Sequence, residues 1–263
     1  MGAELAKVQK DLLFKSEYTG INTGSGAVYP PVINILQSDK QFKAFGNADM
    51  STKSYGKLFI RNEANRPEDL VDELVGTAIK IEVGHEVRDE QKVIGSGDRL
   101  LSPDEKEDLE SKGLKPINMV KVLLAIGDAK ATSEAMVNYD KKMENNTASS
   151  SDFPFALLSI KGSSWGSWIE AQSQMEDLCQ REYGVASKDS IASLFKFSIK
   201  SKEENSTKYG KYYSTEVAVE LNDPDEASAF APMVVGMKDF GMFYEVAQKI
   251  ENRENVVDTF KGM

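Results

Sequence analysis

The chain has 263 residues, of which 40% are apolar and 28% are charged, so its composition is that of an ordinary globular protein. It has no apolar run of about 18 residues and no basic-then-apolar leader, which argues against a membrane span or a secretory signal and predicts a cytoplasmic protein. The net charge of −10 excludes a surface that is basic throughout, but it leaves room for a local basic site.

Residues 1–77 are predicted to form an N-terminal arm with short strands that pack on the main domain. Two consecutive prolines forbid a helix and favour an extended entry into a short strand at 32–36. A second short strand is expected at 56–61, ending on an exposed Arg61.

The next stretch predicts two strands around a surface helix. Apolar and polar residues alternate over 78–87, where Gly84 is expected to mark a bulge or a bend. Ser102 is followed by a proline and, at the third helical position, a glutamate, which predicts a capped helix that ends at Gly113. This helix is acidic and is expected to be solvated. The apolar run 117–126 predicts a strand that is buried on both faces.

A polar segment and a second helix follow. Residues 132–152 are rich in Ser, Asn and Lys and are predicted to end in a loop. The run 153–161 predicts another strand. Ser167, with Glu170 three residues later, predicts a helix with a capping box that ends at Gly184.

The clearest local pattern is a predicted β-hairpin over 194–221. Apolar and polar residues alternate on both sides of a polar turn. Over 195–213, five lysines and two glutamates give a local net charge of +3 in an acidic chain. Lysines interleaved with tyrosines are typical of sites for single-stranded nucleic acid, where ammonium groups meet phosphates and rings stack on bases. The alternative is a solvated hairpin with no binding role.

The last stretch, 223–263, is predicted to be helical. It carries an apolar stripe made of Phe240, Phe243, Tyr244, Ala247 and Ile250. This stripe is expected either to form helix core or to hold two copies together in a homo-oligomer.

From residue 78 onward, the predicted order is three strands, one helix and two strands, which is the order of an OB-fold barrel. We therefore expect an α+β protein in which 78–222 form an OB-like antiparallel β-barrel with a helix between strands three and four. The hairpin supplies strands four and five, and its basic tip takes the place of a loop that such folds use on oligonucleotides. The extension 1–77 and the helices of 223–263 flank this barrel.

Three segments resemble phage- and plasmid-type single-stranded DNA-binding proteins. They are PFALLSIKGSSW (154–165), FKFSIKSK (195–202) and KYGKYYSTEVAVEL (208–221), and they cover about the C-terminal third of the chain. The resemblance implies sequence-independent binding that protects single strands during replication or recombination. Several such proteins end in an acidic tail that recruits partners, whereas this chain ends in NRENVVDTFKGM, with mixed charge, which puts such recruitment in doubt.

The predicted contact residues combine lysines for phosphates with aromatic rings for bases. They are Lys161, Trp165, Lys196, Lys200, Lys202, Lys208, Tyr209, Lys211 and Tyr212. Trp165 is equally consistent with a stacking platform and with a core position, whereas Trp168 is expected in the core. Alternation places Tyr213 toward the core and Tyr212 on the opposite face.

The sequence predicts no enzyme, metal site or cofactor. It has one cysteine, Cys179, which excludes an internal disulfide, and one histidine, His85, far from it in the chain. No G-x-S-x-G, Walker or H-E-x-x-H motif occurs. A structural or interaction protein, such as a phage assembly component, remains the main alternative. A metal-dependent nuclease built on clustered carboxylates is a weaker one.

Overall fold

The computed structural model describes residues 21–23, 27–46, 50–61, 65–90, 92–149, 152–183, 196–207, 210–219 and 237–261. It confirms a mixed α+β protein with antiparallel sheets. The strands are β1 (Ile21–Asn22), β2 (Ala27–Val28), β3 (Ile33–Ile35), β4 (Leu58–Ile60), β5 (Glu73–Asp89), β6 (Lys92–Gly97), β7 (Lys115–Ile126), β8 (Phe155–Lys161), β9 (Lys196–Ser206) and β10 (Gly210–Val219). The α-helices are α2 (Pro103–Ser111), α3 (Ala129–Glu144), α4 (Trp165–Tyr183), α5 (Met237–Glu251) and α6 (Val257–Lys261). The 3₁₀ helices are η1 (Asp39–Phe45), η2 (Thr52–Ser54), η3 (Pro67–Asp69) and η5 (Gly162–Ser164).

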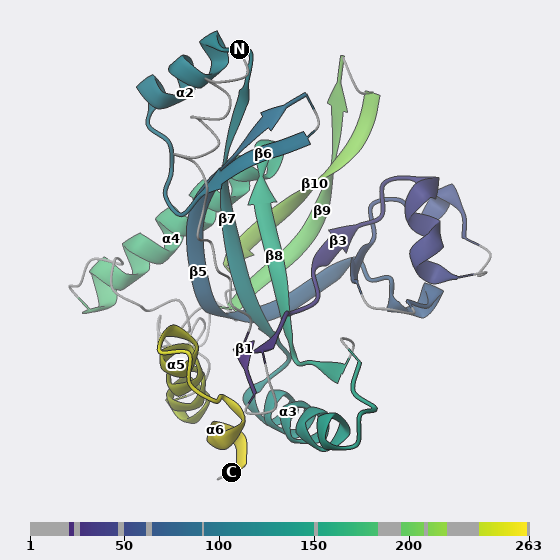
Figure 1. Cartoon of the computed structure of the whole chain (residues 1–263), viewed down its shortest axis with the longest axis vertical. Coiled ribbons are helices and arrows are strands. Elements are labelled where there is room, and N and C mark those ends of the chain that lie inside the picture. The colour runs from purple at the N-terminus through teal and green to yellow at the C-terminus, as the bar shows by residue number, and fades with distance from the viewer. Residues whose placement is uncertain are drawn as a thin grey trace.

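The main sheet has six strands in the order β10-β9-β5-β7-β8, with β6 added to part of β5. β5 pairs with β7 along one edge, whereas its opposite edge pairs first with β9 and then with β6. Three successive long strands, β5, β7 and β8, therefore lie side by side, and the fourth, β9, returns beside the first, as in a Greek key. In Figure 1, α4 lies behind this sheet, α2 lies at one end, and α3, α5 and α6 gather at the other.

The inner face of the sheet packs against α4 and against the two-stranded β3–β4 ribbon. The largest core cluster joins alternating residues of β7, β8, β9 and β10 to α4 residues such as Trp168 and Met175. It also includes Ile33 and Ile35 from β3 and Leu58 from β4. Period-two alternation produces this face, as the sequence predicts for the strands. The predicted strand at 78–87 is longer than expected, because β5 runs from Glu73 to Asp89.

Of the two features expected at Gly84, the bulge is absent, because the shifts in register lie elsewhere along β5. Instead, a Cβ atom at Gly84 would lie 2.3 Å from the carbonyl oxygen of Gly97 on β6. Glycine is needed here because the two backbones approach closely.

The edge of β10 is covered by side chains rather than by another strand. Three N–H groups of β10 donate to side chains: Tyr213 N to Gln37 Oε1 (3.3 Å), Thr215 N to Ser164 Oγ (2.8 Å) and Val217 N to Ser167 Oγ (3.2 Å). The two serines lie in η5 and in the first turn of α4, which follow β8 in the chain, so side chains bridge the gap between β8 and β10. The sheet is thus not closed into a barrel by a continuous backbone ladder. Ser167 is not the predicted N-cap, because α4 already begins at Trp165.

A second core lies on the outer face of the sheet, at the end where α3, α5 and α6 gather. It joins Leu123 and Phe155 from the sheet to Met136 from α3 and to Met242 and Phe243 from α5. The C-terminal apolar stripe therefore serves as core at its described positions. The helix α3 was not expected, because its segment was predicted to be polar and to end in a loop.

None of the helices in the described part of the chain is both long and apolar enough to cross a membrane.

The helix α2 has the predicted capping box. Ser102 Oγ accepts from Glu105 N, and the Glu105 carboxylate accepts from Ser102 N at 2.9 Å. Arg99 Nη1 donates to the same carboxylate at 2.8 Å. These contacts lower the pKa of Glu105 from 4.5 to about 2. The hydrogen bonds from Arg99 have the largest effect on this pKa, and the bond from the Ser102 backbone has the next largest.

This lowered pKa gives a pH-dependent contribution to stability. The contribution is present above the unfolded pKa, near 4.5, and is lost as the pH falls toward the folded value of about 2. In Glu105→Gln, the free energy of unfolding should fall less steeply in this pH window than in the wild type. Urea unfolding at a series of acidic pH values measures this slope. Glu107→Gln, an exposed carboxylate on the same helix, is the matched control, and equal slopes in both variants would contradict the assignment.

Candidate nucleic-acid interface

The register of the β9–β10 hairpin divides the predicted contact residues between two faces. Lys200, Lys202 and Tyr212 lie on one face, opposite Glu216, Ser214 and Glu204 of the partner strands respectively. Lys211 and Tyr213 share the other face with the buried side chains of Val217 and Ile199. Tyr213 packs partly buried against the main core, which confirms that Tyr212 and Tyr213 point to opposite sides.

Two of the hairpin lysines have acidic partners. Lys200 Nζ lies 3.3 Å from Glu73, and Lys211 Nζ lies 2.5 Å from Glu203 and 5.6 Å from the ring centroid of Tyr213. The hydrogen bond to Glu203, and then that to Tyr213, raises the pKa of Lys211. Exposed ion pairs of this kind contribute little to stability, so a phosphate can still compete for either lysine.

The other predicted contact residues of the hairpin differ in how exposed they are to a ligand. Lys202 is exposed and takes part in none of the ion pairs formed by described residues. Lys196 is half-buried at the opposite end of the hairpin from its tip, beside Thr77 of β5. Lys208 and Tyr209 lie outside the described residues.

Lys161, at the end of β8, is bound to a buried carboxylate. Its Nζ lies 3.2 Å from both carboxylate oxygens of Glu86, whose side chain is 8% exposed. Arg88 Nη2 contacts the same carboxylate at 2.5 Å. Lys161 therefore has a structural partner on the surface where it was predicted to meet phosphate.

The two tryptophans belong to the core region. Trp168 is buried, with its ring centroid 6.0 Å from that of Phe197, as predicted. Trp165 is half-buried and packs against the same core cluster. Its contacts favour packing over an exposed stacking role.

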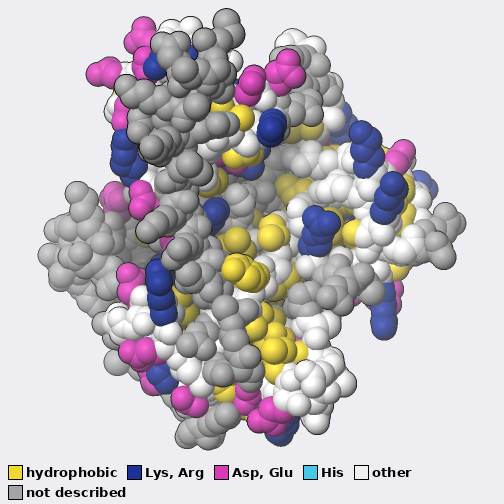
Figure 2. All heavy atoms as spheres, in the orientation of Figure 1, with side chains coloured by type: hydrophobic (Ala, Val, Ile, Leu, Met, Phe, Trp, Pro, Cys, Tyr) yellow, Lys and Arg dark blue, Asp and Glu magenta, His cyan; other side chains and the backbone are white. Residues whose placement is uncertain are grey.

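The outer face of β7 and β8 combines cationic and apolar side chains beyond the second core. Met119 lies opposite Lys161, and Lys121 lies opposite Ser159 and Glu82. Lys121 is half-buried and belongs to no ion pair within the described ranges, because Glu82 pairs instead with Lys80 at 3.1 Å. In Figure 2, hydrophobic side chains line the middle of this side of the molecule, and Lys and Arg side chains gather beside them.

The β3–β4 ribbon continues this outer face beyond β8. Val32 forms a parallel bridge with Leu157, whose N–H donates to the carbonyl of Pro31 at 2.8 Å. On the other side of β3, Arg61 N donates to Val32 O at 2.8 Å. The row Leu123–Leu157–Val32–Arg61 therefore crosses from the main sheet onto the ribbon.

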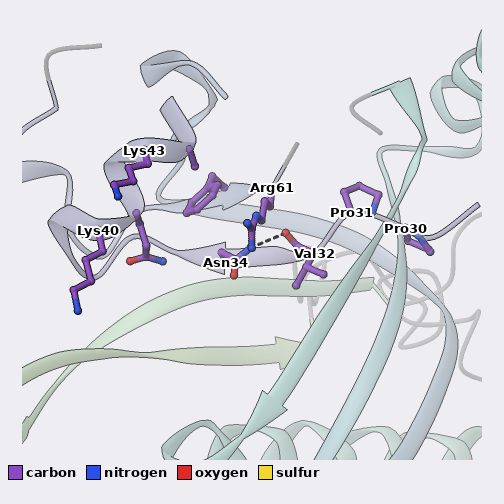
Figure 3. Close-up of a pocket in the computed structure, with 10 residues that line it drawn as sticks. Pro30, Pro31, Val32, Asn34, Lys40, Lys43 and Arg61 are labelled. Atoms are coloured by element: carbon purple, nitrogen blue, oxygen red, sulfur yellow. Dashed lines mark hydrogen bonds between the residues drawn. The ribbon is translucent and has the colours of Figure 1, made fainter. Parts of the chain in front are cut away.

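An open groove of about 780 Å³ lies between this ribbon and η1. It is lined by Pro30, Pro31, Val32, Asn34, Lys40, Gln41, Lys43, Ala44, Phe59 and Arg61. Figure 3 shows Lys40 and Lys43 at one end, Asn34 and Arg61 in the middle, and the two prolines at the other end.

The cations of this groove were not among the predicted contacts. Arg61 was expected to be exposed at the end of a short strand, but Lys40 and Lys43 were overlooked. Their i, i+3 spacing in a 3₁₀ helix places both on one side, since such a helix has three residues per turn. That spacing was the available signal, and it needed the 3₁₀ helix to be recognised first.

Comparison of the chain with protein-family models, with curated proteins and with solved structures gave no match. Within the described residues, no three His, Cys, Asp or Glu side chains come together as a metal site would require.

Proposed function

We propose that the protein binds single-stranded DNA without sequence preference, through an OB-like arrangement of β5, β7, β8, β9 and β10. The strand order carries this proposal: it is a Greek key with a fifth strand, and α4 lies between the third and fourth strands. OB-folds are partly open Greek-key barrels of five strands that bind oligonucleotides. A fold alone does not determine function, so the proposal also depends on the residues that this sheet presents to a ligand.

In OB-folds, the ligand lies on the second and third strands, between the loop after strand one and the loop after strand four. Here the second and third strands are β7 and β8, whose outer face carries Lys121, Lys161 and Met119. The loop after strand one corresponds to residues 90–114, and the loop after strand four is the β9–β10 turn, beside which Lys202 and Lys211 lie.

The expected mechanism combines charge and stacking. Lysine ammonium groups replace counterions on the phosphates, so the affinity should fall steeply as salt rises. Aromatic rings such as Tyr212 stack on bases of any identity, which makes binding independent of sequence.

Fluorescence anisotropy of a labelled oligo-dT tests this function. An oligonucleotide of about 30 nucleotides exceeds the roughly 4–16 nucleotides that one OB fold covers. We expect tight binding at low salt that weakens at high salt and that duplex DNA does not displace. Absence of binding at low salt, together with large oligomers that resist nuclease, would instead favour an assembly protein.

Lys121→Gln should weaken this binding. The change removes one positive charge from the middle of the proposed face and keeps a polar side chain of similar reach. Loss of one phosphate contact should reduce the slope of log K against log salt by about 0.7. Lys130→Gln on α3 is the matched control and should bind as the wild type does. Equal slopes for the two variants would move the contact away from β7.

A further inference from the structure

The groove between η1 and the β3–β4 ribbon has an unbalanced charge. Of its ten lining residues, three are cationic, Lys40, Lys43 and Arg61, and none is acidic. All three are exposed, and the ion pairs of the described chain include none of them. In a protein of net charge −10, a groove of this kind concentrates positive potential where an anion can enter.

The 3₁₀ helix η1, which carries Lys40 and Lys43, is held in place by hydrogen bonds. Gln41 fixes η1 to β3, because its Oε1 accepts from Gln37 N (2.6 Å) and Ser38 N (3.1 Å) while its Nε2 donates to Ile35 O (2.9 Å). The Tyr55 hydroxyl also donates to Asp39, which ties η1 to the turn after η2.

A small hydrophobic core lies between η1 and β4. It contains Leu36, Phe45 and Phe59, and the rings of the two phenylalanines pack edge to face at 5.1 Å. The groove is therefore a preformed feature rather than the gap between two loose loops.

An exposed aromatic residue, Tyr29, adjoins the proline end of the groove in the chain, although it is not itself a lining residue. Tyr29 directly precedes the lining prolines, and it is 67% exposed. A residue before proline favours extended conformations, so the backbone of Tyr29 is restricted. Aromatic rings along a path that also carries cations are the usual stacking platforms for unpaired bases.

The groove is also continuous with the outer face of β7 and β8. Val32 lines the groove and pairs with Leu157 of β8, so one ligand can contact both surfaces. A flexible single strand has the length and the repeated phosphates for such a path. An acidic peptide lacks bases for Tyr29, and a duplex keeps its bases stacked inside.

We infer that this groove is an additional contact site for single-stranded nucleic acid, with phosphates on Lys40, Lys43 and Arg61 and a base stacked on Tyr29. This inference rests on the proposed function and assigns the part of the ligand path that lies beyond β8.

The test compares two triple variants in the full chain. The groove variant is Lys40→Gln/Lys43→Gln/Arg61→Gln, which removes three positive charges from the groove. The control variant is Lys130→Gln/Lys141→Gln/Lys142→Gln, which removes three positive charges from α3. Oligo-dT anisotropy is measured over a salt series. Losing three single-strand phosphate contacts should reduce the salt slope by about 2, whereas the α3 variant should keep the wild-type slope. Tyr29→Ala should weaken binding by about 5- to 150-fold, and Tyr29→Phe should not.

The outcomes separate this inference from the proposed function. If the wild type binds and both triple variants have equal slopes, the groove assignment is overturned while single-strand binding stands. If the wild type does not bind at low salt, the proposed function itself fails. If poly-glutamate displaces oligo-dT from the wild type but not from the groove variant, and Tyr29→Ala has no effect, the groove is a site for acidic peptides instead. Should the triple variant not fold, as judged by circular dichroism, the Tyr29 pair decides the question.

Discussion

The double variant Ser164→Ala/Ser167→Ala should lose a large part of the stability of the protein. Each serine accepts a hydrogen bond from the edge of β10, at Thr215 N (2.8 Å) and Val217 N (3.2 Å). Val217 is buried, so its N–H has little access to water once the hydroxyl is removed. A buried donor left without a partner costs about 1–3 kcal/mol, and the half-buried Thr215 N–H adds a smaller cost to that of Val217. Small domains have about 5–15 kcal/mol in total.

Urea unfolding measures this loss, and Ser163→Ala provides the matched control. Ser163 is an exposed residue of the same turn, so its hydroxyl can be removed without changing the edge of β10. If the double variant and the control have the same unfolding midpoint, the two hydroxyls do not hold the edge.

Removal of the serine hydroxyls should also change how the molecules associate. Uncovered N–H groups on an edge strand are a template for pairing with another chain. We expect the double variant to form dimers or larger species at concentrations where the wild type does not. Size-exclusion chromatography at several protein concentrations measures this change.

The hydrogen bonds at the edge of β10 also explain why the predicted capping role of Ser167 is wrong. A serine three residues before a glutamate satisfies the local rule for a capping box, and the same rule correctly predicts the helix that begins after Ser102. Ser167 Oγ instead accepts from Val217 N, 50 residues away in the chain, and no local rule reports such a contact. Local patterns are therefore reliable where both partners are local.

The strands were predicted well because alternation directly reports burial on one face. The helix α3 was missed because only a narrow side of it is buried. Thr132, Met136 and Tyr139 recur at helical spacing on that side, and Tyr139 packs edge to face against Phe153 at 5.0 Å. Polar residues cover the rest of the helix, and for this reason the stretch was predicted only as a polar segment that ends in a loop.

The predicted contact residues also show that local patterns do not report partners that lie far away in the chain. The local charge of the hairpin was counted from neighbouring residues, but Glu73, which pairs with Lys200, belongs to a distant strand. The groove cations come from two elements that only the fold brings together. Sequence could predict that lysines lie on the hairpin, but not which lysines keep their charge free for a ligand.

Glu86→Gln should have opposite effects on stability and on nucleic-acid binding. The buried Glu86 carboxylate holds both Lys161 (3.2 Å) and Arg88 (2.5 Å). Glutamine has the same shape but no charge, so two cations would remain side by side without a neutralising group. Hydrogen bonds to charged groups contribute about 1.5–3 kcal/mol, and we expect a loss of stability of this size.

The same substitution should release Lys161 toward solvent. Its side chain is already 38% exposed, so its ammonium can turn to a phosphate once the carboxylate charge is gone. One added contact should make the slope of log K against log salt steeper by about 0.7. Lys161→Gln provides the comparison, because it also breaks the pair but adds no free cation.

Oligo-dT anisotropy over a salt series and urea unfolding of both variants separate the two roles of Lys161. If Glu86→Gln is less stable and its salt slope is steeper, Lys161 lies on the path of the ligand but is restrained by Glu86 in the wild type. If Glu86→Gln loses stability with an unchanged slope, Lys161 is a structural residue of the sheet. The proposed face would then depend on Lys121, Lys202 and the groove cations, which have no acidic partner among the described residues.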